Sequence, residues 1–178
     1  MTDSPRIQEL RRRVQVDPAS PAFAQLAEEL RRAGRPQEAV EVCHAGLEFQ
    51  PAYTSARATL GRALLDLGML DEALAEFHAV LEAAPEHLSA LKGVGEAHQR
   101  GGRLEQALAA YRQALALARE DPDLLRAVAS LEAAVRPPAA AVPPPPPASP
   151  PRVPAEPPAL AGLERLLAGI LADRARRG

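Results

Sequence analysis

Sulfur-containing and aromatic residues are scarce in this 178-residue sequence. The single cysteine, Cys43, excludes an internal disulfide and a thiolate zinc site. Tryptophan is absent and aromatic residues make up only 3% of the chain. Proteins that hold single-stranded nucleic acid usually stack its bases on aromatic side chains, so we expect no such role here.

The sequence also lacks an excess of positive charge and a long hydrophobic run. Its formal net charge is −2, so phosphate backbones are not attracted and we expect no nucleic acid partner. No run approaches roughly 18 consecutive apolar residues, so we expect no membrane span. Residues 1–6 lack the apolar stretch of a secretory signal, and we therefore expect a cytoplasmic location.

Alanine and leucine supply most of the apolar residues, which make up 47% of the chain. Both are strong helix formers, whereas β-branched residues, which favour strands, are scarce. The composition therefore predicts an all-α protein. Its high alanine, arginine and proline content is also typical of GC-rich bacterial genomes.

A residue pattern recurs every 34 positions between Ser20 and Asp121. One position of each unit holds a small residue: Ala27, Gly61, Gly95 and Ala129. Glycine inside a helix costs about 1 kcal/mol relative to alanine. Gly61 and Gly95 therefore indicate a close backbone contact that a Cβ would obstruct.

Each unit is expected to form two helices joined by a tight turn. A glycine recurs at the turn, where a left-handed backbone favours it: Gly34, Gly68 and Gly102. Pro51 and Pro85 follow the second helices of their units, because proline cannot continue a helix. One larger position on the second helix holds Cys43, Phe77 and Tyr111.

This period, with its small residues, turn glycines and prolines, resembles the tetratricopeptide repeat (TPR) family of 34-residue helix–turn–helix units. The resemblance implies an all-α TPR helical solenoid over residues 1–136. Its parts are three repeats and two half-repeat caps: an N-terminal helix over 5–16, repeats 20–53, 54–87 and 88–121, and a capping helix over 122–135.

Two further segments follow the repeats. Residues 137–158 contain 12 prolines among 22 residues, which predicts a disordered, extended linker rather than a packed element. Residues 159–178, hereafter the tail, place Leu163, Leu167 and Ile170 on one face of an amphipathic helix.

Four roles for the tail remain open. It docks on a partner, folds back onto its own repeats, self-associates weakly as a short coiled coil, or lies on a membrane. The absence of tryptophan and lysine disfavours the membrane. Residues 20–121 have a net charge of −5 and the tail +2, which favours folding back to a modest extent.

Residue patterns typical of enzymes are missing. His44 and His78 occupy equivalent positions one period apart, so the repeat explains both. Cys43 shares its position with Phe77 and Tyr111, which indicates a core residue rather than a nucleophile. Neither phosphate-binding glycine loops nor zinc-binding histidine motifs occur. We expect no catalytic residue, no cofactor and no metal.

In the TPR family the first helix of each unit lines a concave groove. The resemblance therefore implies the following partner-binding residues: Glu28, Arg31, Ser55, Thr59, Arg62, Asp66, Lys92, Glu96, Gln99 and Arg100, with Leu163, Leu167 and Ile170 of the tail. Some members clamp a carboxylate with basic and amide side chains. The matching positions here are Ala24, Glu28, Thr59, Ser89 and Gly93, which do not fit that role.

The sequence thus predicts a non-enzymatic adaptor that binds a helical or extended protein segment in its groove and docks through its tail. The alternative is a self-associating or autoinhibited structural protein, whose tail occupies its own groove or that of a neighbouring copy.

Overall fold

The computed structural model describes residues 3–136, 165–168, 172 and 176. Residues 3–136 form eight α-helices, and the described residues include no strand, so the predicted all-α fold is confirmed. The helices are α1 (Pro5–Val16), α2 (Ala22–Arg32), α3 (Pro36–Phe49), α4 (Thr54–Asp66), α5 (Leu70–Ala83), α6 (Leu88–Arg100), α7 (Leu104–Leu117) and α8 (Pro122–Val135).

The three turn glycines end the first helix of each unit as predicted. Gly34, Gly68 and Gly102 have positive φ angles of 74°, 78° and 73°, in the left-handed region that glycine adopts without a Cβ clash. The next amide then donates back across the turn, as from Arg35 N to the Leu30 carbonyl at 3.0 Å. This bond satisfies a carbonyl that the end of the helix leaves without a partner.

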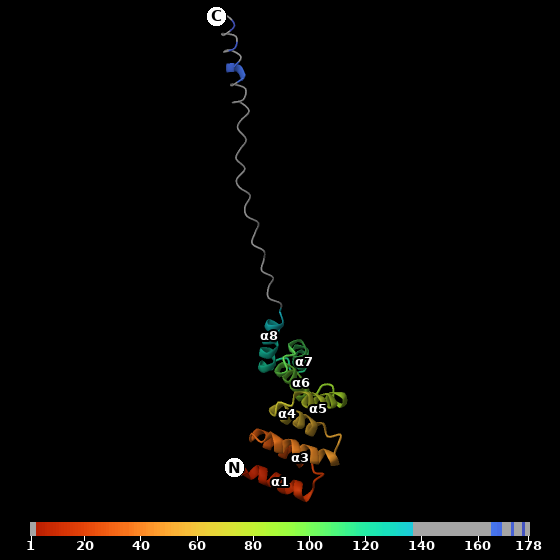
Figure 1. Ribbon diagram of the computed structural model, residues 1–178. Helices are drawn as coiled ribbons and strands as arrows, with labels where there is room; N and C mark the ends of the chain where they lie inside the picture. The colour runs from red at the N-terminus through yellow and green to blue at the C-terminus, as the bar shows by residue number, and fades with distance from the viewer. Residues whose placement is uncertain (1–2, 137–164, 169–171, 173–175, 177–178) are drawn as a thin grey trace. The chain divides into compact units, whose positions relative to one another are not determined.

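The helices stack in chain order from α1 to α8 (Figure 1). Each helix contacts the next one along the chain, and α2 also contacts α4, as α4 contacts α6. Within the described residues α8 contacts only α7. The first helices α2, α4 and α6 therefore lie side by side as one layer of the solenoid, and the second helices pack against them.

Aromatic rings fill the space beside the small residues. A Cβ on Gly61 would lie 2.6 Å from the Phe77 ring, and one on Gly95 would lie 2.7 Å from the Tyr111 ring. The predicted close contacts therefore exist. The neighbouring group is an aromatic side chain and not backbone, because the second helix inserts its largest residue at this point.

Cys43 belongs to the core, since its side chain is fully buried and its thiol donates to the Ala56 carbonyl at 3.7 Å. Burial raises the pKa of the Cys43 thiol to about 12, so the thiolate is strongly disfavoured.

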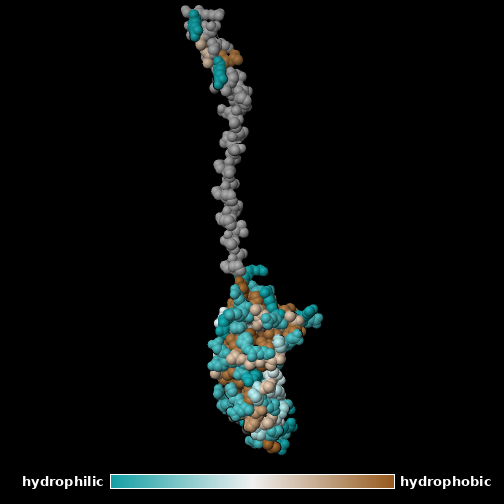
Figure 2. Space-filling view, turned by 90° about the vertical axis from the view of Figure 1, so that its right-hand side faces the viewer, coloured by the Kyte–Doolittle hydropathy of each residue, from teal (hydrophilic) through white to brown (hydrophobic). Residues whose placement is uncertain are grey.

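Hydrophobic patches on the visible face of the repeats are small and scattered among hydrophilic ones (Figure 2).

The tail is described only in part. Arg165–Ala168 are helical, and Leu166 and Leu167 are exposed. Leu163, Ile170 and the linker over residues 137–158 lie outside the described residues. In the described part of the chain, no helix is both long and apolar enough to cross a membrane.

Candidate protein-binding surface

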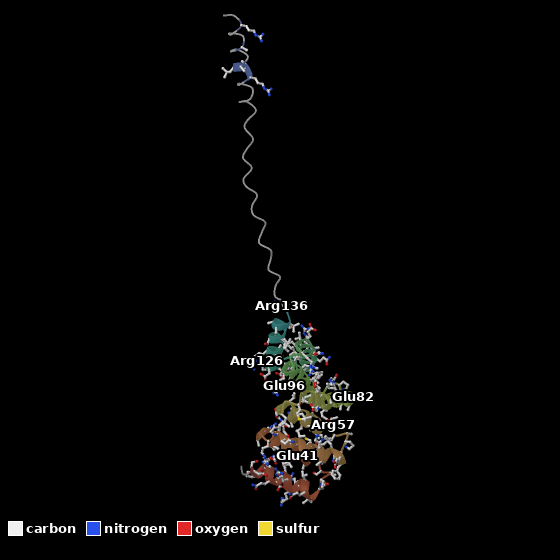
Figure 3. All side chains as sticks on the ribbon, viewed as in Figure 1. Glu41, Arg57, Glu82, Glu96, Arg126 and Arg136 are labelled. Carbon is white, nitrogen blue, oxygen red and sulfur yellow. The ribbon has the colours of Figure 1, made fainter. Side chains whose placement is uncertain are left out.

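The layer of first helices places most of the predicted partner-binding residues on one side of the repeats. Glu28, Arg62 and Glu96 occupy equivalent positions on α2, α4 and α6. We call this side the first-helix face. The second helices α3, α5 and α7 pack against this layer, and we call their side the outer side. Figure 3 labels Glu96 on α6 and Glu82 on α5.

A shallow cavity of about 230 Å³ opens on this face between α2 and α4. It is lined by Arg6, Ala24, Gln25, Glu28, Glu29, Tyr53, Ser55 and Thr59. Three of the predicted residues, Glu28, Ser55 and Thr59, thus meet in one place. Thr59 is only 4% exposed, so it contributes to the wall, whereas Ser55 is exposed to solvent.

Several of the residues that line the cavity escaped sequence reasoning. Arg6 comes from α1, and Tyr53 precedes α4 in the connection between two units. The Tyr53 ring packs edge-on against Phe23, with their centroids 5.7 Å apart. The period of 34 residues does not predict this contact, because Tyr53 lies in the connection between α3 and α4 and belongs to neither helix.

An ion network joins α2 to α4. Glu28 accepts from Arg32 Nε at 2.8 Å and from Arg31 Nη2 at 3.1 Å, and Arg62 Nη2 lies 3.2 Å from it. Arg31 Nη1 reaches across to Asp66 Oδ2 at 2.9 Å. The predicted residues Glu28, Arg31, Arg62 and Asp66 are therefore partners of one another.

The surroundings of Glu28 and Arg62 lower both pKa values, for different reasons. Burial by itself would raise the pKa of Glu28, but the guanidinium groups of Arg31, Arg62 and Arg32 outweigh it and lower the pKa. Burial lowers the pKa of Arg62. Its Nε is buried without a hydrogen-bond partner among the described residues, while Nη2 donates to Thr59 at 3.3 Å.

The α6 part of the face is fastened to neighbouring elements. Lys92 Nζ donates to Asp121 Oδ2 at 2.8 Å, and Arg100 Nη1 donates to the Leu65 carbonyl at 2.7 Å. Gln99 accepts from the Tyr111 hydroxyl at 3.3 Å. These side chains thus already have hydrogen-bond partners within the protein. A ligand on this part of the face would have to displace these partners or bind beside them.

Metal-binding chemistry finds no support in residues 3–136 or in the described tail residues. They contain no group of three or more histidine, cysteine, aspartate or glutamate side chains arranged to hold a metal ion. Most polar residues of the first-helix face are instead in ion pairs or exposed to solvent.

Stacked pairs of helices with polar side chains along one layer define the class of α-helical repeat proteins. The family model described as "Tetratricopeptide repeat" matches residues 30–94 and 64–131, which together exceed half of the sequence. The chain therefore belongs to the tetratricopeptide repeat family, as the sequence pattern predicted.

Solved TPR structures share the fold. MamA from Desulfovibrio magneticus RS-1 is 24% identical with a TM-score of 0.65, and the match covers 72% of this chain and 73% of MamA. The second TPR domain of human RPAP3, solved with the HSP70 peptide SGPTIEEVD, is 16% identical with a TM-score of 0.58. That match covers 62% of this chain and 92% of the RPAP3 domain.

YrrB, described as a TPR protein with an unusual peptide-binding site, is 30% identical with a TM-score of 0.56. The match covers 60% of this chain and 55% of YrrB. No curated protein matches the sequence.

Proposed function

We propose that this protein is a non-enzymatic adaptor that binds a segment of another protein on its first-helix face and docks through its tail. The observation that supports groove binding is the cavity between α2 and α4, where predicted residues from two repeats meet. The RPAP3 domain was solved with a bound peptide, and YrrB has a peptide-binding site, so peptide binding is a role this fold supports.

The charges of the face suggest the chemistry of the ligand. Glu28, Arg62 and Glu96 alternate in sign along the layer, and Glu28 is already paired with Arg62. A ligand of one charge sign would meet repulsion as often as attraction. We therefore favour a helical or extended segment with mixed charges.

A free carboxylate is a poor ligand for this face. The positions that match the carboxylate clamp of other members include Ala24 and Gly93, which offer no side-chain donor, and Glu28, which repels an anion. The proposed partner is thus recognised along its length and not by its terminal carboxylate.

The second candidate function is a self-associating or autoinhibited protein whose tail occupies its own first-helix face or that of another copy. The opposite net charges of residues 20–121 (−5) and of the tail (+2) favour it. In that case binding of a partner would require displacement of the tail.

A matched pair of substitutions tests groove binding. Peptides are selected on the full chain from a random display library, and their affinities are measured for Gln25→Arg and Gln37→Arg. Gln25 lines the cavity on α2, whereas Gln37 is exposed on the second helix α3 of the same unit. Both changes add one positive charge at an exposed glutamine.

We expect Gln25→Arg to change the affinity by about tenfold, the effect of altering a contact residue worth roughly 1.4 kcal/mol. Gln37→Arg should leave the affinity unchanged. Peptides whose binding responds to Gln37→Arg and not to Gln25→Arg would contradict binding on the first-helix face.

A further inference from the structure

Within residues 3–136, no second helix packs on α8 as one packs on each of α2, α4 and α6. Phe23 on α2 and Leu91 on α6 are 0% and 5% exposed, because α3 and α7 pack over them. Leu125 occupies the equivalent position on α8 and is 47% exposed. In the first and third units the second helix therefore buries this position, whereas on α8 the same position is exposed to solvent.

The small-residue position shows the same difference. Ala27, Gly61 and Gly95 are buried beneath the second helix of their units, whereas Ala129 on α8 is exposed. Among the described residues, α8 contacts only α7. The face of α8 that bears Leu125 and Ala129 is thus exposed within the described residues, and it has the residues that contact a second helix in the other units.

The tail has the residue pattern of the missing helix. Second helices of this chain place a small residue next to a larger apolar one, with further apolar or small residues four, seven and eight positions after the first. In α3 these residues are Ala39, Val40, Cys43, Gly46 and Leu47. In the tail they are Gly162, Leu163, Leu166, Gly169 and Ile170.

The alignment pairs the two glycines and the residues that they would face. In the first unit Gly46 lies against Phe23 so closely that a Cβ on Gly46 would come within 2.2 Å of the ring. Gly169 corresponds to Gly46, and Leu125 corresponds to Phe23. The tail therefore has a glycine where the exposed leucine of α8 would require one.

The connection permits this arrangement. Other units join their helices through short turns, such as residues 33–35, whereas residues 137–158 separate α8 from the tail. The entropy of closing a loop grows only logarithmically with its length, so a long linker weakens the pairing without preventing it. Arg165–Ala168 are helical, and Leu166 exposes apolar surface that docking would bury.

We propose that residues 159–172 are the second helix of a fourth repeat and dock on the Leu125 face of α8 in the same molecule. This inference deepens the proposed role of the tail and rests on it, whereas binding on the first-helix face is independent of it. The tail would reach a partner only by leaving α8, so docking on α8 would regulate the adaptor.

An engineered disulfide in the full chain tests the register. The pair Leu125→Cys with Gly169→Cys places thiols where Phe23 and Gly46 meet in the first unit. The control pair is Arg126→Cys with Gly169→Cys, because Arg126 is highly exposed and lies on another side of α8. Cys43 is fully buried and will not compete.

Under mild oxidation in dilute solution, we expect the first pair to form its intramolecular disulfide about tenfold faster or more, since docking raises the local concentration of the two thiols. Equal rates for the two pairs would overturn the proposal. A disulfide that forms mainly between two chains would overturn it as well.

Hydrogen exchange provides a second readout without engineered thiols. In the full chain, amides of residues 163–171 should exchange slowly, and Leu125→Arg should abolish this protection. The matched control is Leu117→Arg, at a leucine of α7 that is 42% exposed, and it should leave the tail protected. An unprotected tail, or protection that survives Leu125→Arg, would refute docking on α8.

The two proposals fail separately. If the tail does not dock on α8, peptide affinities will still distinguish Gln25→Arg from Gln37→Arg. If the first-helix face binds no peptide, the disulfide and exchange measurements will still report on the tail.

Discussion

The two ends of the repeat region each consist of half a unit, but their free faces differ. At α1 the free face is mostly polar, with Val16 as an exposed apolar residue: Arg13 Nε lies 3.0 Å from Glu9 Oε1, and Arg12 Nη2 lies 2.8 Å from Glu9 Oε2. At α8 the free face includes Leu125 and the exposed Ala129. Terminal repeats of a solenoid normally need a polar outer side. The N-terminal half unit meets most of this requirement through its charged residues, whereas the C-terminal one exposes Leu125 at the position that a second helix covers in the first and third units.

The attachment of the two end helices differs as well. Arg11 bonds Asp3 at 2.9 Å and Glu38 at 2.8 Å, and Arg35 bonds the same two carboxylates. This four-residue cluster ties the start of α1 to Arg35 in the turn after α2 and to Glu38 in the first turn of α3. At the other end α8 has an ion pair between Arg112 and Glu132 at 2.6 Å and the Asp121 cap. Ion pairs with the neighbouring unit thus attach the N-terminal half unit, whereas the C-terminal half unit keeps an exposed face on which another helix could pack.

The largest expected effect comes from truncating equivalent positions in the first unit and in α8. Phe23→Ala removes a fully buried ring and should lower the free energy of unfolding by about 3–5 kcal/mol. Leu125→Ala should lower it by only about 1 kcal/mol, because the leucine is half exposed. Urea denaturation of a chain that ends at residue 138, and so lacks the tail proposed to cover α8, measures both. Equal losses would contradict an open face at α8.

Enlarging the small-residue position should show the same asymmetry. Gly61→Leu forces a side chain into the Phe77 ring and should destabilise the protein by about 1–3 kcal/mol. In the same shortened chain, Ala129→Leu adds the same side chain at an exposed position and should leave the melting temperature of the repeats nearly unchanged. A tolerated leucine at position 61 would show that the tight contact is absent.

Acid should loosen α1 through its ion cluster. The Arg35 guanidinium is the main group that lowers the pKa values of Asp3 and Glu38. Carboxylates whose pKa is lower in the folded state stabilise it above their ordinary pKa and lose this contribution as the pH falls through the lowered value.

Amide exchange in α1 should therefore accelerate below about pH 4, the ordinary range of these carboxyl groups. Arg35→Gln should weaken the dependence on pH. An α1 whose exchange follows only the intrinsic effect of pH would show that the cluster does not hold the helix.

The smallest effect concerns the start of α8. The Asp121 carboxylate caps the helix by accepting from the amides of Asp123 and Leu124 at 2.9 and 3.1 Å. Asp121→Ala should destabilise the protein by about 1 kcal/mol, whereas Asp121→Asn keeps the cap and should cost less. Chemical denaturation of both variants measures the difference, and identical losses would assign the effect to the Lys92 ion pair alone.

The sequence predicted the fold because the determinants repeat. Gly34, Gly68 and Gly102 give each of the three helix pairs a turn glycine, and Gly61 and Gly95 recur inside two of the first helices. The nature of the contact at Gly61 was missed, since spacing shows that space is short but not which group fills it.

The surface was less predictable because its contacts join different units. The pairing of Glu28 with Arg62 depends on how far α4 is rotated relative to α2, which the period does not specify. Thr59 was expected to be available to a partner but is almost fully buried, since its side chain lies beside α2. The role of each predicted residue toward a partner remains a prediction.

The most direct test of the central claim is hydrogen exchange of the full chain with and without a selected peptide. The account predicts that the peptide slows exchange in the first helices α2, α4 and α6 and leaves α3, α5 and α7 unchanged. Protection confined to the second helices would place the binding surface on the outer side of the repeats and contradict the account.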